Sequence, residues 1–202
     1  MLDLALKTTS LFGGAERASS DEALAARVRA SGDTAAFAQL VTRYRGRMVT
    51  LARRMLLGAN PDEAEDIAQE AFAAAYHKRT TFRPGEPFRP WLYRIVVNRC
   101  LDRLRTHSRR PVFVTLEQAA EPISADGDPL TAVLADEREV RLTAAVAALP
   151  PHHRAVFLLR HLDDLSYTEI GAATGLPPGT VKTHLFRARA QLRQYLAGYL
   201  EL

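Results

Sequence analysis

Two carboxylates and one carboxamide share a stripe of a predicted helix near residue 70. Asp66, Gln69 and Glu70 are separated by three residues and then one, so their side chains fall on one side of an α-helix. Acids at a helix N-terminus can simply favour the helix dipole, which explains Asp66 less well and Glu70 hardly at all. The alternative interpretation is a docking site for a basic surface of a protein partner.

A second group combines aromatic rings, an amide and charges around the start of a later predicted helix. Trp91 and Asn98 are seven residues apart and share a helix face. A ring beside an amide, edged by arginine, could stack on and read an unpaired base. The alternative is that Trp91 caps the domain core. The candidate residues for this nucleic-acid site are Phe82, Phe88, Trp91, Asn98, Arg99 and Asp102.

The C-terminal part of the chain has the pattern of a helix-turn-helix. Ser166 and Glu169 can form a capping box, Gly175 follows where a helix must stop, and Pro178 starts another helix. The face of the last helix opposite its apolar stripe carries small, polar and basic side chains suited to a DNA major groove. A helical hairpin with a merely solvated basic face is the alternative. The candidate duplex contacts are Thr180, Lys182, Thr183, Phe186 and Arg187.

Other kinds of chemistry find no support in the sequence. The single cysteine, Cys100, excludes a disulfide framework within the chain and a cysteine-based zinc site, and it falls on an apolar arc where we expect a small buried hydrophobe. His152 and His153 are adjacent, so they point about 100° apart on a helix. There is no phosphate-cradling glycine loop and no nucleophile–base pair. We therefore expect no metal, no cofactor and no catalytic residue.

The elements that must position these groups are predicted to be helices alone. No segment alternates between apolar and polar residues as a strand would, whereas apolar residues recur every three or four positions. Asn60, Pro61 and Glu63 have the types expected at a helix start. The predicted helices span residues 21–30, 34–57, 61–79, 91–106, 136–149, 151–162, 166–174 and 178–196.

Charge divides the chain into blocks. The net charge is +8 for residues 22–110, −6 for residues 111–140 and +3 for residues 141–202. Basic blocks favour a polyanionic partner, although a solvated arginine-rich surface would give the same count. We predict an N-terminal tail (1–21), a helical domain (22–110), a flexible acidic linker (111–137) rich in proline, and a second helical domain (138–202). No apolar run approaches the roughly 20 residues of a membrane helix and no leader is evident, so we expect a cytoplasmic protein without membrane insertion.

Several segments in this order resemble the extracytoplasmic-function (ECF, group 4) sigma factors of bacterial RNA polymerase. The motifs that carry the resemblance lie at residues 62–72, 88–98, 149–150, 166–171 and 179–189. The resemblance covers roughly residues 22–110 and 138–197. A helix-turn-helix alone would be a weak indication, but its combination with the two upstream motifs is specific. The first 21 residues match nothing in this pattern.

The resemblance implies a division of labour. Asp66, Gln69 and Glu70 would grip the clamp helices of the polymerase β′ subunit. The loop at residues 82–90 and the Trp91/Asn98 face would capture a flipped base of the single-stranded −10 element. The helix from Pro178 would enter the major groove of the −35 duplex, while other parts of that domain would touch the β flap. The acidic linker would follow the path of nascent RNA, and an anti-sigma protein is a further implied partner. His184 stands where many relatives carry arginine, so no base contact is assigned to it.

Two alternatives are weaker. A DNA-binding regulator that uses only the helix-turn-helix would bind duplex DNA without polymerase. A metal nuclease is a third possibility that no ligand cluster in the sequence supports.

Overall fold

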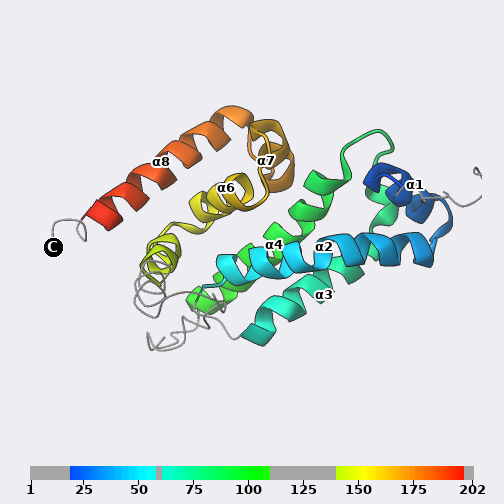
Figure 1. Cartoon of the computed structure of the whole chain (residues 1–202), viewed down its shortest axis with the longest axis horizontal. Coiled ribbons are helices and arrows are strands. Elements are labelled where there is room, and N and C mark those ends of the chain that lie inside the picture. The colour runs from blue at the N-terminus through cyan, green and yellow to red at the C-terminus, as the bar shows by residue number, and fades with distance from the viewer. Residues whose placement is uncertain (1–18, 58–60, 110–139, 198–202) are drawn as a thin grey trace, which may run out of the picture.

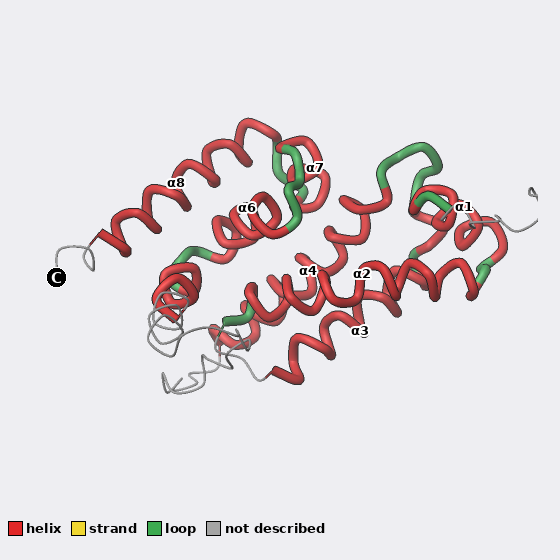
Figure 2. Tube along the Cα trace, in the orientation of Figure 1, coloured by secondary structure: helices red, strands yellow, loops and turns green. Residues whose placement is uncertain are grey.

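The computed structural model describes residues 19–57, 61–109 and 140–197, and in these ranges every regular element is a helix (Figures 1 and 2). This confirms the all-α prediction. The predicted linker, most of the predicted tail, and the cap at Asn60 lie outside the described residues. The helices are α1 (Asp21–Ser31), α2 (Thr34–Met55), α3 (Pro61–His77), the short 3₁₀ helix η1 (Arg79–Thr81), α4 (Phe88–Arg109), a helical stretch at residues 140–147, α6 (Pro151–Leu162), α7 (Tyr167–Thr174) and α8 (Pro178–Ala197).

The first four α-helices form an N-terminal bundle around α2. The side chain of Asp33 accepts a hydrogen bond from the Ala36 amide at 2.9 Å and caps α2. Behind this cap, Leu40, Tyr44, Met48 and Leu51 are buried at the three- and four-residue spacing that the sequence predicts. Helices α1, α3 and α4 all pack on α2. Each large apolar side chain buried in this way contributes about 1.5–3 kcal/mol, so this stripe holds the bundle together.

Helix α4 begins three residues before its predicted start at Trp91. The carboxylate of Glu22, in α1, accepts a hydrogen bond from the Phe88 amide at 3.3 Å. This cap comes from a residue 66 positions earlier in the chain. Local sequence signals at residues 88–91 therefore could not place the helix start.

Helices α6, α7 and α8 form the C-terminal bundle. The predicted capping box is confirmed: the Ser166 hydroxyl accepts from the Glu169 amide at 3.2 Å, and the Glu169 carboxylate accepts from the Ser166 amide at 2.8 Å. Gly175 ends α7 at φ 74°, a conformation that favours glycine. At Gly171 a Cβ would lie 2.8 Å from the Leu176 carbonyl oxygen, so the turn needs glycine there as well.

The two bundles pack directly against one another. Helix α7 lies against α4, and α6 lies against α2 (Figure 1). The buried apolar residues of both bundles form one continuous cluster. Nothing in the sequence pattern indicated this contact between the two predicted domains. None of the described helices combines the length and the hydropathy needed to cross a bilayer.

Candidate functional site

The predicted acidic stripe on α3 is exposed. Asp66, Gln69 and Glu70 are all accessible, whereas their neighbours Ile67 and Ala68 are 1% exposed. The packing of these apolar neighbours against the bundle turns the stripe outward. The three predicted residues therefore share one solvent-facing side of a rigid helix.

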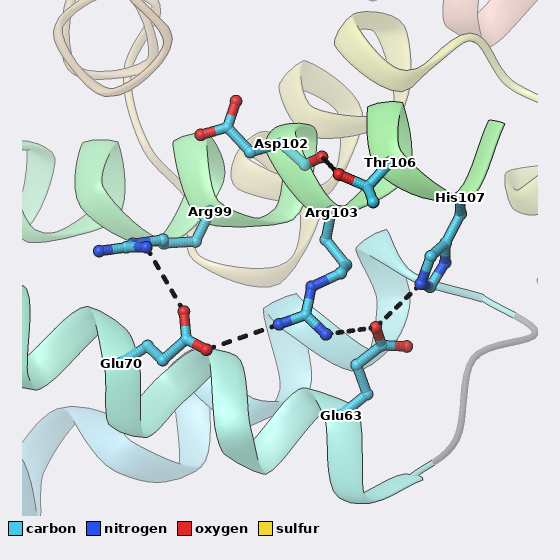
Figure 3. Close-up of polar contacts among 7 residues, drawn as sticks. All are labelled: Glu63, Glu70, Arg99, Asp102, Arg103, Thr106 and His107. Atoms are coloured by element: carbon cyan, nitrogen blue, oxygen red, sulfur yellow. Dashed lines mark hydrogen bonds and ion pairs between the residues drawn. The ribbon is translucent and has the colours of Figure 1, made fainter. Parts of the chain in front are cut away.

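Glu70 also takes part in an ion network between α3 and α4 (Figure 3). Its two carboxylate oxygens lie 3.5 Å from Nη1 of Arg99 and 3.5 Å from Nη2 of Arg103. Arg103 in turn lies 2.7 Å from Glu63, which also lies 3.1 Å from Nε2 of His107. The network links Glu70 of α3 to two arginines of α4. It also connects a residue of the acidic stripe with one of the predicted nucleic-acid contacts.

Three of the six predicted single-strand contacts come together in one groove. Asn98, Arg99 and Asp102, at steps of one and three residues along α4, line a groove of about 410 Å³. Lys78 and Arg105 line the same groove and give it three basic side chains against one acid. Asp102 is paired with Arg105 at 2.7 Å. The groove thus offers cations for phosphate groups and an amide and a carboxylate for base edges.

The other three predicted contacts, Phe82, Phe88 and Trp91, pack together in the core at the start of α4, and a direct role of these rings in binding nucleic acid stays a prediction. Phe82 and Phe88 are each 2% exposed, and Trp91 is only partly exposed. The Trp91 ring centroid lies 5.6 Å from that of Phe82 and 5.7 Å from that of Phe88. A small bundle gains more by burying these large rings than by leaving them in water. The three rings hold the start of α4 in place.

The predicted face of α8 is accessible to a partner. Lys182, Thr183, Phe186 and Arg187 are exposed, and Thr180 is half-buried. Phe186 has 68% of its surface exposed, which is unusual for a phenylalanine. The opposite stripe, which includes Val181 and Leu185, is buried. Packing on α6 and α7 therefore presents this face to solvent as the helix-turn-helix pattern predicts.

A histidine pair behind this face was not predicted from the sequence. The rings of His153 and His184 lie 4.7 Å apart, centroid to centroid, and Nδ1 of His184 is buried without a hydrogen-bond partner. Burial, followed by the charges of His153, His152 and Arg187, lowers the pKa of His184. Within the described ranges no three potential ligands gather as a metal site. The spacing of 31 residues between the two histidines gave no signal that they would meet.

Cys100 is buried as predicted. Its exposed fraction is 0%, and burial raises the pKa of its thiol to about 12. A thiol of this kind stays protonated and unreactive at neutral pH.

Comparison with known proteins gives the same assignment for both bundles. Residues 40–110 match the family model for sigma-70 region 2, and residues 139–192 match that for sigma-70 region 4. The chain is 38% identical over 174 residues to the ECF RNA polymerase sigma factor SigW of Bacillus subtilis, covering 82% of this chain and 91% of SigW. It is 35% identical over 176 residues to the ECF RNA polymerase sigma-E factor of Escherichia coli, covering 84% of this chain and 90% of that one.

Solved structures show the same fold. The structure of CnrH in complex with the cytosolic domain of CnrY has a TM-score of 0.66 at 30% identity, over 88% of this chain and 97% of that one. RpoE from Bartonella quintana, crystallised with the anti-sigma factor NepR, has a TM-score of 0.65 at 23% identity, over 80% of this chain and 96% of that one. On these similarities in sequence and fold, the chain belongs to the ECF sigma factors of RNA polymerase.

Proposed function

We propose that three exposed faces of this sigma factor divide the work of promoter recognition between them. The faces are the acidic stripe of α3, the groove between the end of α3 and α4, and the outer face of α8. The observation that supports the proposal best is that exposed residues predicted for each face lie together: all three of the acidic stripe, three of the six single-strand residues in the groove, and four of the five duplex residues on α8. The predicted domains, residues 22–110 and 138–202, would carry these faces.

The acidic stripe would bind the core polymerase. Asp66, Gln69 and Glu70 offer two carboxylates and an amide, which suit the basic clamp helices of the β′ subunit implied by the family resemblance. Arg99 and Arg103 lie 3.5 Å from Glu70 in exposed ion pairs, so binding would exchange weak internal pairs for contacts with the polymerase.

The groove would take the single-stranded −10 element. Lys78, Arg99 and Arg105 would contact phosphates, while the Asn98 amide and the Asp102 carboxylate would read base edges. Trp91 would contribute with the part of its ring that remains exposed, whereas Phe82 and Phe88 would act through the core that they fill. Capturing a base outside the duplex shifts the duplex toward the melted state, at a cost of a few kcal/mol for unstacking.

The outer face of α8 would enter the major groove of the −35 element. Lys182 and Arg187 would supply charge-assisted phosphate or base contacts, and the exposed ring of Phe186 would contact apolar base edges. The Thr183 hydroxyl donates to the Gly179 carbonyl at 3.0 Å and keeps acceptor capacity for DNA. Thr180 would lie at the edge of this contact.

The protein would supply specificity and the polymerase would supply catalysis. We assign no catalytic residue, no metal and no cofactor to the chain. An anti-sigma protein is a further proposed partner, since the related CnrH and RpoE structures contain CnrY and the anti-sigma factor NepR, respectively.

A mobility-shift experiment separates this function from that of a simple DNA-binding regulator. Promoter fragments would be incubated with the chain alone, with core polymerase alone and with both together. The proposal predicts a specific, heparin-resistant complex only when both proteins are present. Tight and specific binding by the chain alone, unchanged by core polymerase, would instead favour the regulator.

A further inference from the structure

Helix α8 packs on α6, and histidines lie on both sides of this contact (Figure 1). His153 and His161 belong to α6, and His184 belongs to α8. We call the contact made by these three residues with Arg189 and Gln191 of α8 the α6–α8 seam. Because the opposite face of α8 is the one proposed to enter DNA, the seam sets the direction in which that face points.

The position of His184 suits an uncharged imidazole. Its Nδ1 atom is buried without a hydrogen-bond partner, and its ring centroid lies 4.7 Å from that of His153. A neutral ring can leave Nδ1 bare and carry its hydrogen on Nε2. A protonated ring would instead bury an N–H donor without an acceptor. Its charge would also face His152 and His153 of α6 and Arg187 of α8.

His161 meets α8 two turns further along α6, and its contact also requires a neutral ring. Its Nε2 atom lies 3.5 Å from Nη2 of Arg189. A guanidinium can only donate hydrogen bonds, so Nε2 of His161 accepts and carries no hydrogen. Protonation would turn this acceptor into a second donor beside Arg189. Arg160, the preceding residue, adds another positive charge.

Acids at the ends of α6 and α7 do little to offset these charges. Glu169, the acid of α7, accepts a hydrogen bond from the Ser166 amide at 2.8 Å in the capping box. The carboxylate of Asp163 accepts a hydrogen bond from the Tyr93 hydroxyl in α4. Asp164 favours a charged His161, but less than burial and the neighbouring arginines oppose it.

Both rings are therefore harder to protonate in the seam than in water. Burial is the largest cause that lowers the pKa of His184 and that of His161, and nearby positive charges add to it. If α8 moves away from α6, the two rings return to water and to the ordinary pKa of about 6.5. Acid thus favours the displaced position of α8 over the packed one. His153 differs, because its Nδ1 lies 3.4 Å from Oε1 of Gln191, an acceptor that a charged ring can keep.

We propose that the α6–α8 seam makes promoter recognition sensitive to protons: neutral His184 and His161 hold α8 in position, and their protonation weakens binding to the −35 element. This inference rests on the proposed function, because it assumes that the outer face of α8 binds the −35 duplex. The N-terminal bundle contains neither histidine, so the acidic stripe and the groove keep their function in acid. The loss of −35 affinity follows the fraction of molecules in which α8 is displaced.

The test measures DNA binding by the holoenzyme at about pH 7.5 and about pH 5.5, which lie on either side of the ordinary histidine pKa. One probe is a promoter fragment selected with the wild-type chain at the higher pH. The other is a forked fragment with a single-stranded −10 element and no −35 element. His184→Gln and His161→Gln keep an amide acceptor but cannot be protonated. His77→Gln, at the exposed end of α3, is the matched control.

At the higher pH, all four holoenzymes are expected to bind the promoter fragment equally. At the lower pH, His184→Gln and His161→Gln should each bind it about three- to tenfold more tightly than wild type. About tenfold is the limit that one proton sets at one pH unit below the ordinary pKa. His77→Gln should match wild type. Binding to the forked fragment should be the same for all four at either pH, because α8 does not take part in it.

Equal binding of wild type and His184→Gln to the promoter fragment at the lower pH would overturn the proposal. Tighter binding by wild type would overturn it too, since the protonated ring would then act as a DNA contact. A nuclear magnetic resonance titration of His184 in the free chain is a check that needs no DNA, and a pKa at or above the ordinary 6.5 would also overturn the proposal. Failure of the proposed function would appear differently, as no promoter binding by the wild-type holoenzyme at the higher pH.

Discussion

Glu70 of α3 and Arg99 of α4 face each other at 3.5 Å, so a residue proposed to bind polymerase is paired with one proposed to bind DNA (Figure 3). Both side chains are 45% exposed, and exposed ion pairs contribute only about 0–1 kcal/mol. The pair therefore orients both groups without holding them firmly. If polymerase binds Glu70 as proposed, Arg99 would be released from this pair and could contact a phosphate.

Glu70→Lys is expected to weaken binding to core polymerase by about 2 kcal/mol or more, roughly thirtyfold, because a cation would face a basic surface. Fluorescence anisotropy with labelled chain and purified core enzyme measures the affinity. Glu65→Lys is the control: it makes the same charge change on the same helix and breaks an exposed pair with Arg45. Equal losses of affinity in the two variants would indicate a general charge effect. They would contradict the proposal that the acidic stripe binds core polymerase.

Asn98→Ala is expected to impair promoter opening while leaving polymerase binding intact. Loss of the amide removes base contacts worth about 1–3 kcal/mol, so open complexes should fall about five- to hundredfold. Permanganate reactivity of unpaired thymines reports the opening directly. Gln39→Ala, which removes an exposed amide from α2, should leave opening unchanged. If Asn98→Ala melts promoters as well as wild type, the groove does not bind the −10 strand.

Gly171→Ala tests the turn that aims α8. The added methyl group would lie 2.8 Å from the Leu176 carbonyl oxygen, so we expect a loss of about 1–3 kcal/mol in the free energy of unfolding, together with loss of −35 binding. Gly46→Ala, also within a helix, meets no atom within 4 Å and should gain about 0.5–1 kcal/mol. Urea unfolding of both variants gives the comparison. A Gly171→Ala protein as stable as wild type would show that the turn can relax.

His184 makes stability depend on pH. Its pKa in the folded state lies below the ordinary 6.5, so the folded protein takes up this proton less readily than the unfolded chain does. The contribution of neutral His184 to the free energy of unfolding is complete above pH 6.5, and it is lost as the pH falls through the lowered pKa of the folded state. The pKa of His161 is also lowered, chiefly by burial, and adds to the same dependence.

In His184→Gln, the decrease in melting temperature between pH 7 and pH 5 should therefore be smaller than in the wild type. A decrease should still remain. Thermal unfolding followed by circular dichroism across this range is the measurement. His77→Gln, which changes an exposed residue at the end of α3, should retain the wild-type slope. An unchanged slope in His184→Gln would mean that the histidine pair does not control this titration.

Local patterns predicted most of the helices. The spacing of Leu40, Tyr44 and Met48 indicated α2, and Ser166 with Glu169 indicated the start of α7, because both signals act within one or two turns of a helix. The start of α4 could not be predicted in this way, since its cap comes from Glu22. The Tyr93–Asp163 bond joins residues 70 positions apart, and neither residue type carries a signal for the other.

The candidate sites also contain residues that local patterns could place and residues whose positions depend on packing between helices. Periodicity placed Asp66 with Glu70, and Asn98 with Asp102, because each pair lies on a single helix. The burial of Phe88 could not be predicted from the sequence, because its ring fills space that only the packed bundle defines. The contribution of Lys78 to the groove likewise depends on how α3 and α4 pack.

Run-off transcription with purified bacterial core polymerase and a library of promoter fragments tests the sigma-factor assignment most directly. The expected result is a set of transcripts with defined start sites that appear only when the chain is added. The starts should be preceded by shared sequences near −35 and −10. Association with core polymerase without any chain-dependent transcript, or no association at all, would contradict it.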